Sequence, residues 1–149
     1  MKNSIVVFTK RFLDVLYIIS VGGTLISPGL ITWYSTYNPR VSNSLIPLII
    51  LFFIAGIFGA LILRELKKMM NTVVLGDCFV RSNVTSLKRM GTFSFVISGV
   101  MFLRVFTEYF TPSIPILVFT FLVAGLFSKV LAIVFDQAVS YKLENDMTI

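Results

Sequence analysis

The chain has 149 residues, enough for one domain; 56% of them are hydrophobic and only 13% are charged. A soluble domain of this size has too much surface to hide so many apolar side chains, so the composition excludes an ordinary soluble fold and indicates a membrane protein. The net charge of +6 comes from basic residues that flank apolar runs, which favours contact with anionic lipid over direct nucleic-acid binding.

Four apolar runs have the length of about 20 residues that a helix needs to cross a bilayer. Backbone groups inside lipid must be satisfied within their own segment, so these runs are predicted to be helices. The predicted fold is an all-α integral membrane protein, a four-transmembrane-helix bundle forming a single membrane domain over residues 1–149. The predicted spans cover about residues 12–33, 44–63, 91–109 and 114–135.

Glycines and a proline mark the first two spans. Pro28 predicts a kink near the outer end of the first span, because proline lacks a backbone donor and clashes with the preceding turn. Gly56 and Gly59 in the second span have the spacing that lets another helix approach closely. The alternative for the first span is a broken helix that lines a substrate site.

Lysine and arginine concentrate on one side of the predicted spans. They occur in the N-terminal tail, in the segment 64–89 and at Lys142, whereas the opposite connections contain only Arg40. Because basic residues are retained in the cytoplasm, we expect both termini and the middle segment to be cytoplasmic.

The middle segment predicts a helix of its own. The second helix is expected to run on to Leu75 and to end at Gly76, and Asp77 is a candidate N-cap. Residues 78–90 place apolar side chains on one face and cations on the other, which predicts a cytoplasmic amphipathic helix at the membrane surface, with its apolar face in the lipid or against the bundle. This helix is expected to turn into the third span at Gly91.

The fourth span is expected to stay amphipathic up to about Tyr141, before a polar C-terminal tail over residues 142–149. We hypothesise that this acidic tail docks on the basic middle segment; the alternative is a solvated chain end. The candidate interaction residues are Phe79, Arg81, Asn83, Leu87, Lys88, Arg89, Glu144, Asn145 and Asp146.

These two segments also carry a family resemblance. Gly76-Asp77-Cys78-Phe79-Val80-Arg81-Ser82-Asn83, then Leu87-Lys88-Arg89-Met90-Gly91, and the ending Glu144-Asn145-Asp146-Met147-Thr148-Ile149 resemble the bacterial membrane family known as domain of unknown function 2975 (DUF2975). Cys78 stands where that family often has proline. The resemblance covers essentially the whole chain and implies a four-span protein of the bacterial plasma membrane, often encoded beside a small helix-turn-helix repressor of the Cro type.

Three charged residues fall inside or at the edge of predicted spans, where charge is costly. Arg104 and Glu108 are four residues apart and can share one helix face, as a gating or proton-linked pair or as a snorkelling arginine neutralised by its neighbour. Lys129 has the same two interpretations, a transport site or a lysine that reaches the cytoplasmic interface.

Signatures of enzymes are missing from the sequence: there is no glycine-rich phosphate loop, no catalytic triad and no histidine at all. We therefore expect no enzymatic activity, no cofactor and no metal. The first functional prediction is a regulatory protein that contacts a cytosolic partner, such as a helix-turn-helix regulator, through residues 64–90 and the tail. The alternatives are a small oligomeric transporter or channel, and an immunity or membrane-protection protein.

Overall fold

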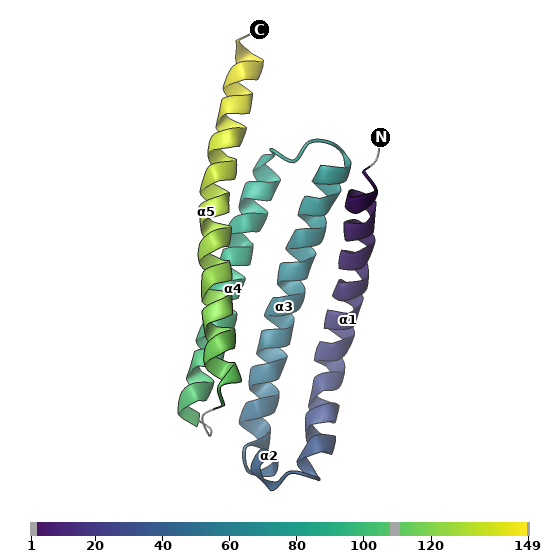
Figure 1. Ribbon diagram of the computed structural model, residues 1–149, viewed down its shortest axis with the longest axis vertical. Coiled ribbons are helices and arrows are strands. Elements are labelled where there is room, and N and C mark those ends of the chain that lie inside the picture. The colour runs from purple at the N-terminus through teal and green to yellow at the C-terminus, as the bar shows by residue number, and fades with distance from the viewer. Residues whose placement is uncertain (1–2, 108–110, 149) are drawn as a thin grey trace.

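The structure is a computed structural model that describes residues 3–107 and 111–148, and all the regular elements in these ranges are helices. Four long helices run along one another, and a short helix lies in the connection between the first two (Figure 1). In chain order they are α1 (Ser4–Ser35), α2 (Pro39–Asn43), α3 (Leu45–Val74), α4 (Arg81–Thr107) and α5 (Ser113–Met147).

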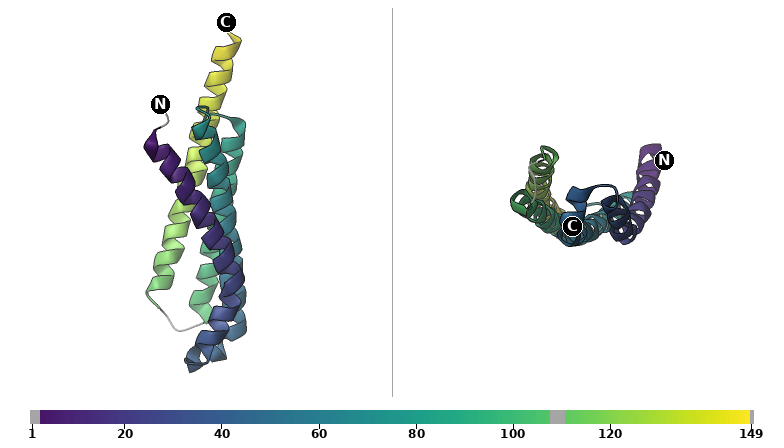
Figure 2. Two further views of the ribbon diagram at one scale, coloured as in Figure 1. Left: turned by 90° about the vertical axis from the view of Figure 1, so that its right-hand side faces the viewer. Right: turned by 90° about the horizontal axis from the view of Figure 1, so that it is seen from below.

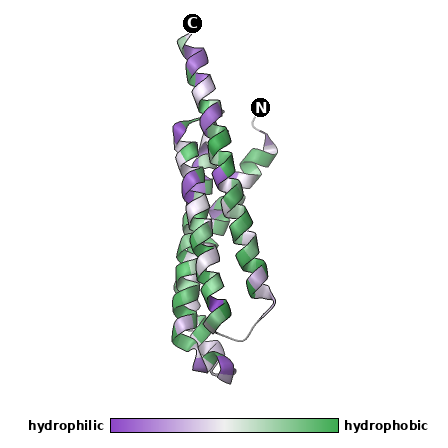
Figure 3. Ribbon diagram, turned by 90° about the vertical axis from the view of Figure 1, so that its left-hand side faces the viewer, coloured by the Kyte–Doolittle hydropathy of each residue, from purple (hydrophilic) through white to green (hydrophobic). Residues whose placement is uncertain are grey.

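Helices α1, α3, α4 and α5 are long and apolar enough to cross a membrane. At 1.5 Å per residue they are roughly 40–50 Å long, more than the hydrocarbon core of about 30 Å. Hydrophobic residues dominate their middle lengths, and hydrophilic residues gather towards the two ends of the molecule (Figure 3). Predicted spans 12–33, 44–63 and 114–135 each fall on one helix, with Ser44 as the N-cap of α3; span 91–109 follows α4 as far as the described residues go.

The four long helices form an open, curved row in the order α1, α3, α4, α5. Each helix packs on the next one in this row, and within residues 3–107 and 111–148 α1 does not pack against α4 or α5. The view along the helices shows the arc, with α1 and α5 at its two ends (Figure 2). The expected bundle is therefore not closed around a central core.

The buried side chains concentrate on α4, which packs against α3 on one side and α5 on the other. Small polar residues, Ser86, Ser94 and Ser98, are buried along it together with apolar ones. Large apolar side chains of α1 and α5 are mostly exposed, as expected for helices whose surroundings are apolar. The buried apolar residues of α4 are Val84, Leu87, Met90, Ile97 and Met101.

The expected separate amphipathic helix over residues 78–90 is not present. Residues 75–80 form a loop, and α4 starts at Arg81 and continues through Gly91 without a break. The apolar face of this segment was predicted correctly. Of the two surroundings expected for it, lipid or the bundle, the structure shows the second, since Leu87 and Val84 are covered by the same chain and are each 4% exposed. Gly91 is a place of close approach, since a Cβ there would lie 2.9 Å from the aliphatic stem of Lys129.

Helix α1 continues across Pro28. The proline cannot donate to the carbonyl of Thr24, and the Ser27 hydroxyl donates to this carbonyl instead at 2.8 Å. Gly56 has the predicted packing role, because a Cβ there would lie 2.4 Å from the Thr24 hydroxyl oxygen of α1. No such neighbour lies within 4 Å of Gly59.

Candidate functional site

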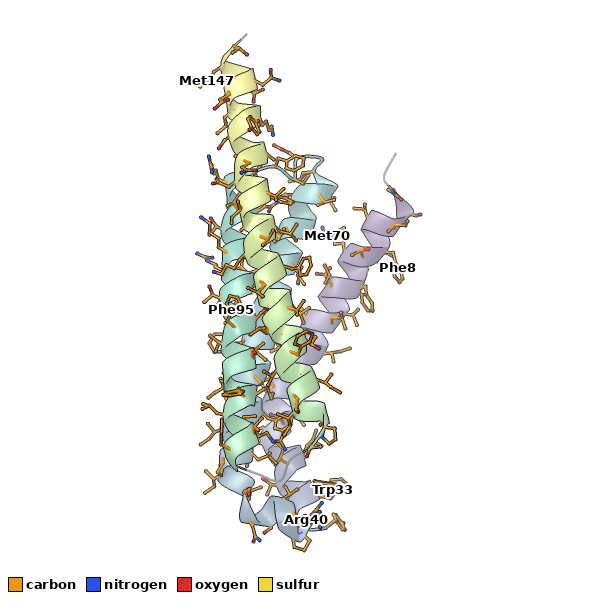
Figure 4. The ribbon with its side chains drawn as sticks, turned by 60° about the vertical axis from the view of Figure 1, so that its left-hand side comes forward. Phe8, Trp33, Arg40, Met70, Phe95 and Met147 are labelled. Carbon is orange, nitrogen blue, oxygen red and sulfur yellow. The ribbon has the colours of Figure 1, made fainter. Side chains whose placement is uncertain are left out.

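Polar contacts between helices gather at one end of the molecule. This end carries the α3–α4 loop of residues 75–80, the start of α1 and the last turns of α5 (Figure 1), and it is called the loop end below. Trp33 and Arg40 lie at the opposite end, and Met147 lies at the tip of α5 (Figure 4).

The termination of α3 at Gly76 is confirmed. Gly76 has φ of 81°, a conformation that glycine adopts without strain. Its N–H donates to the carbonyl of Val73 at 3.1 Å, and the Asp77 N–H donates to the carbonyl of Thr72 at 3.1 Å. These two bonds are the Schellman motif, which satisfies carbonyls at the end of a helix. Asp77 is not an N-cap, because α4 starts only at Arg81.

Asn83 fixes the loop to both helices. Its side chain is 1% exposed, and the amide nitrogen donates to the Thr72 hydroxyl on α3 at 2.6 Å and to the carbonyl of Cys78 at 2.7 Å. Asn83 was predicted as an interaction residue. In the structure its side chain is buried where α3, α4 and the loop between them meet. A buried amide with these partners rigidifies the loop, since leaving them unpaired is costly.

A buried carboxylate joins α3 to α4 further from the loop. Glu65 is 4% exposed and accepts a hydrogen bond from the Ser86 hydroxyl at 2.7 Å. Its other oxygen accepts from the Lys68 amine at 3.0 Å and lies 3.6 Å from the Arg89 guanidinium. The carboxylate is thus surrounded by donors, the condition under which a buried charge is tolerated.

Two ion pairs tie α5 to the loop and to the start of α4. The Arg81 guanidinium pairs with the Asp136 carboxylate and also donates to the Ser140 hydroxyl at 3.2 Å. The Lys142 amine donates to the Asp77 carboxylate at 2.5 Å, and this bond raises the pKa of Lys142 above its ordinary value. All four charged groups are about half exposed, so each pair stabilises only modestly and mainly orients α5.

Beyond these ion pairs α5 projects past the other helices (Figure 1). The helix continues to Met147, and residues 141–148 are all exposed. The hypothesised docking of the tail is not what the structure shows. Glu144, Asn145 and Asp146 extend the helix away from α4, because the backbone bonds of α5 continue through the tail and hold it straight.

Two of the charged side chains inside the predicted spans, Lys129 and Arg104, have partners on neighbouring helices. The Lys129 amine donates to the carbonyl of Lys88 and to the Thr92 hydroxyl, both at 2.8 Å, which places its charge towards the loop end. The Arg104 guanidinium lies 5.5 Å from the centre of the Phe52 ring on α3. Glu108, the predicted partner of Arg104, lies outside the described residues.

Many of the contacts described above involve residues 72–91, the segment that contains the motif of residues 76–83 and 87–91 described from the sequence. A family model described as protein of unknown function (DUF2975) matches residues 30–149. The chain belongs to the DUF2975 family. The match omits the first 29 residues, so it is shorter than the whole-chain resemblance expected from the motifs. No curated protein and no solved structure matches this DUF2975 chain.

The DUF2975 motif residues divide into two groups in the structure. Asn83 and Leu87 are buried, and Phe79 packs its ring 5.4 Å from the ring of Phe135 on α5. Arg81, Lys88, Arg89 and the tail residues Glu144, Asn145 and Asp146 are exposed. In the described ranges no group of three or more histidine, cysteine or acidic residues is placed to hold a metal.

Sequence reasoning missed the acceptors that organise the loop end. Glu65 was not singled out from the sequence, although its spacing of three residues from Lys68 is a signal for an ion pair on one helix face. Its hydrogen bond to Ser86 joins residues that are 21 positions apart, so no local sequence pattern indicates it. Asp136 and Ser140 are four residues apart, so a shared face was predictable, but their partner Arg81 was not.

Proposed function

We propose that this protein is a multi-pass protein of the bacterial plasma membrane with the loop end and both termini in the cytoplasm. In that orientation it acts as a non-enzymatic docking protein for a soluble partner. The observation that carries the proposal is the exposed extension of α5 over residues 141–148, anchored at its base by Lys142 and Arg81.

The orientation is supported by where the basic residues lie. Lys67, Lys68, Arg81, Lys88 and Arg89 all lie at the loop end, while Arg40 lies at the other end beside Trp33. Basic residues favour the cytoplasmic side, and tryptophan favours a membrane interface.

The docking role is supported by the chemistry of the extension. Leu143 and Met147 are four residues apart on one helix face and are 50% and 86% exposed. Glu144 and Asp146 are two residues apart, so they lie on opposite flanks of this apolar stripe and make both flanks acidic. An exposed helix with apolar anchors at this spacing is a common recognition element for a groove on another protein. The partner fitting it has an apolar groove with a basic rim, a description that suits a small helix-turn-helix regulator.

A crosslinking pull-down from native membranes tests this function. The double variant Glu144→Lys and Asp146→Lys reverses the charge of both flanks without removing helix bonds. Lys10→Glu is the control, because it reverses one charge on α1 at the same end. We expect the unchanged protein and the control to capture the same soluble protein, and the double variant to bind it at least tenfold more weakly after purification. A tenfold change corresponds to about 1.4 kcal/mol.

Equal capture by all three proteins would overturn the role of the tail. The other two predicted functions, an oligomeric transporter or channel and an immunity protein, stay predictions. A transporter predicts loss of flux in liposomes on substitution of Arg104 or Lys129.

A further inference from the structure

A lengthwise apolar groove lies between α1 and α3. It has a volume of about 210 Å³ and is open to the surroundings of the helices. Its lining includes Tyr17 and Thr24 from α1 and Phe53, Ile57 and Leu61 from α3, and it ends at Arg64.

Arg64 differs from the neighbouring cations. Lys67 pairs with Asp14 across the same two helices at 2.9 Å, and Lys68 pairs with Glu65. Arg64 is exposed, and in the described part of the chain no carboxylate lies within ion-pairing distance of it. A guanidinium at the mouth of an apolar groove is suited to an anion that carries an apolar chain, and its planar fork matches phosphate.

The length of the groove matches one leaflet of a bilayer. From Phe53 to Arg64 the lining covers eleven residue steps of α3, roughly 16 Å at 1.5 Å per residue. Half of a hydrocarbon core of about 30 Å is about 15 Å. With the loop end at one surface, Arg64 lies at the level of the phosphates and Phe53 near the midplane.

We propose that the α1–α3 groove binds one anionic phospholipid of the leaflet on the loop-end side, with an acyl chain along Ile57 and Leu61 and the phosphate on Arg64. The inference rests on the proposed membrane placement and not on the docking role of α5. The excess of basic residues at the loop end selects an anionic headgroup over a zwitterionic one. The lipid covers apolar surface that the open arc leaves without a helix neighbour.

Native mass spectrometry of the full chain in mild detergent tests the site, with phosphatidylglycerol as the probe. We expect one phosphatidylglycerol to remain bound to the unchanged protein, and Arg64→Gln to reduce this bound fraction at least fivefold. Arg64→Lys keeps the charge and retains most of the binding. Lys10→Gln is the matched control, because it removes one charge at the same end outside the groove, and we expect no change.

Three results would overturn the proposal. The first is equal retention by Arg64→Gln and the unchanged protein, and the second is equal loss in Arg64→Gln and Lys10→Gln. The third is equal retention of phosphatidylcholine and phosphatidylglycerol. Thermal unfolding of each lipid-free sample shows that the variants are folded; since Arg64 is exposed, we expect unchanged midpoints. The pull-down through α5 is independent of Arg64, so failure of the lipid site leaves the docking proposal intact.

Discussion

At the scale of single residues, Glu65 is a buried carboxylate that links α3 to α4. Replacement by alanine removes the acceptor of the buried Ser86 hydroxyl and leaves Lys68 and Arg89 without their carboxylate. An unsatisfied buried donor costs about 1–3 kcal/mol, so we expect Glu65→Ala to lower the free energy of unfolding by that amount. Glu65→Gln still offers an amide oxygen to Ser86, and we expect a smaller loss. Thermal unfolding in detergent measures both.

The control for this prediction is Glu144→Ala, which removes an exposed carboxylate with the same change in net charge. We expect no measurable shift of its unfolding midpoint. If Glu65→Ala and Glu144→Ala shifted the unfolding midpoint equally, the contacts of Glu65 would not stabilise the packing of α3 on α4.

Asn83 makes a second residue-scale prediction. Asn83→Ala leaves the Cys78 carbonyl and the Thr72 hydroxyl without the amide that donates to both. We expect the free energy of unfolding to fall by about 1–3 kcal/mol, with the loss of order confined to the loop. Hydrogen exchange would show it as faster exchange of residues 75–80 with little change at the far ends of α3 and α4. Uniform acceleration over the whole chain would contradict this local role.

At the scale of elements, the approach of α4 to α5 depends on glycine. A Cβ at Gly125 would lie 2.7 Å from the Phe95 ring and 3.2 Å from the Gly91 carbonyl, so a larger residue forces the helices apart. Overpacking of this kind costs about 1–3 kcal/mol, and we expect Gly125→Ala to lower the unfolding midpoint. Gly99 on α4 has no such neighbour within 4 Å, so Gly99→Ala is the matched control. A larger loss for Gly99→Ala would refute the close-packing account.

At the scale of the whole molecule, the orientation can be tested with the native cysteine. The chain has a single cysteine, and Cys78 lies in the loop that we place in the cytoplasm. A membrane-impermeant maleimide is expected to label Cys78 in inside-out vesicles and not in intact spheroplasts. Ser42→Cys in a Cys78→Ser background puts the thiol in α2 at the other end and should reverse the result. Labelling of Cys78 from outside would invert the orientation.

The sequence by itself determined the four long helices and the end of α3. Long apolar runs form helices in a membrane, because each backbone N–H and C=O group must find its hydrogen-bond partner within its own segment. The stop at Gly76 was also predictable, since a helix end with a positive φ is a local event that favours glycine.

Only the tertiary structure decided what each helix face meets. The amphipathic pattern of residues 78–90 identified an apolar face, but an apolar face packs equally well on lipid or on another helix, so the pattern could not show that Val84 and Leu87 are covered by neighbouring helices. The bond between Ser86 and Glu65 and the pair of Arg81 with Asp136 join positions 21 and 55 residues apart, and charge alone does not specify a distant partner. The open arc likewise depends on which helices pack against one another. Side-chain shape at sites such as Gly125 and Phe95 determines this packing.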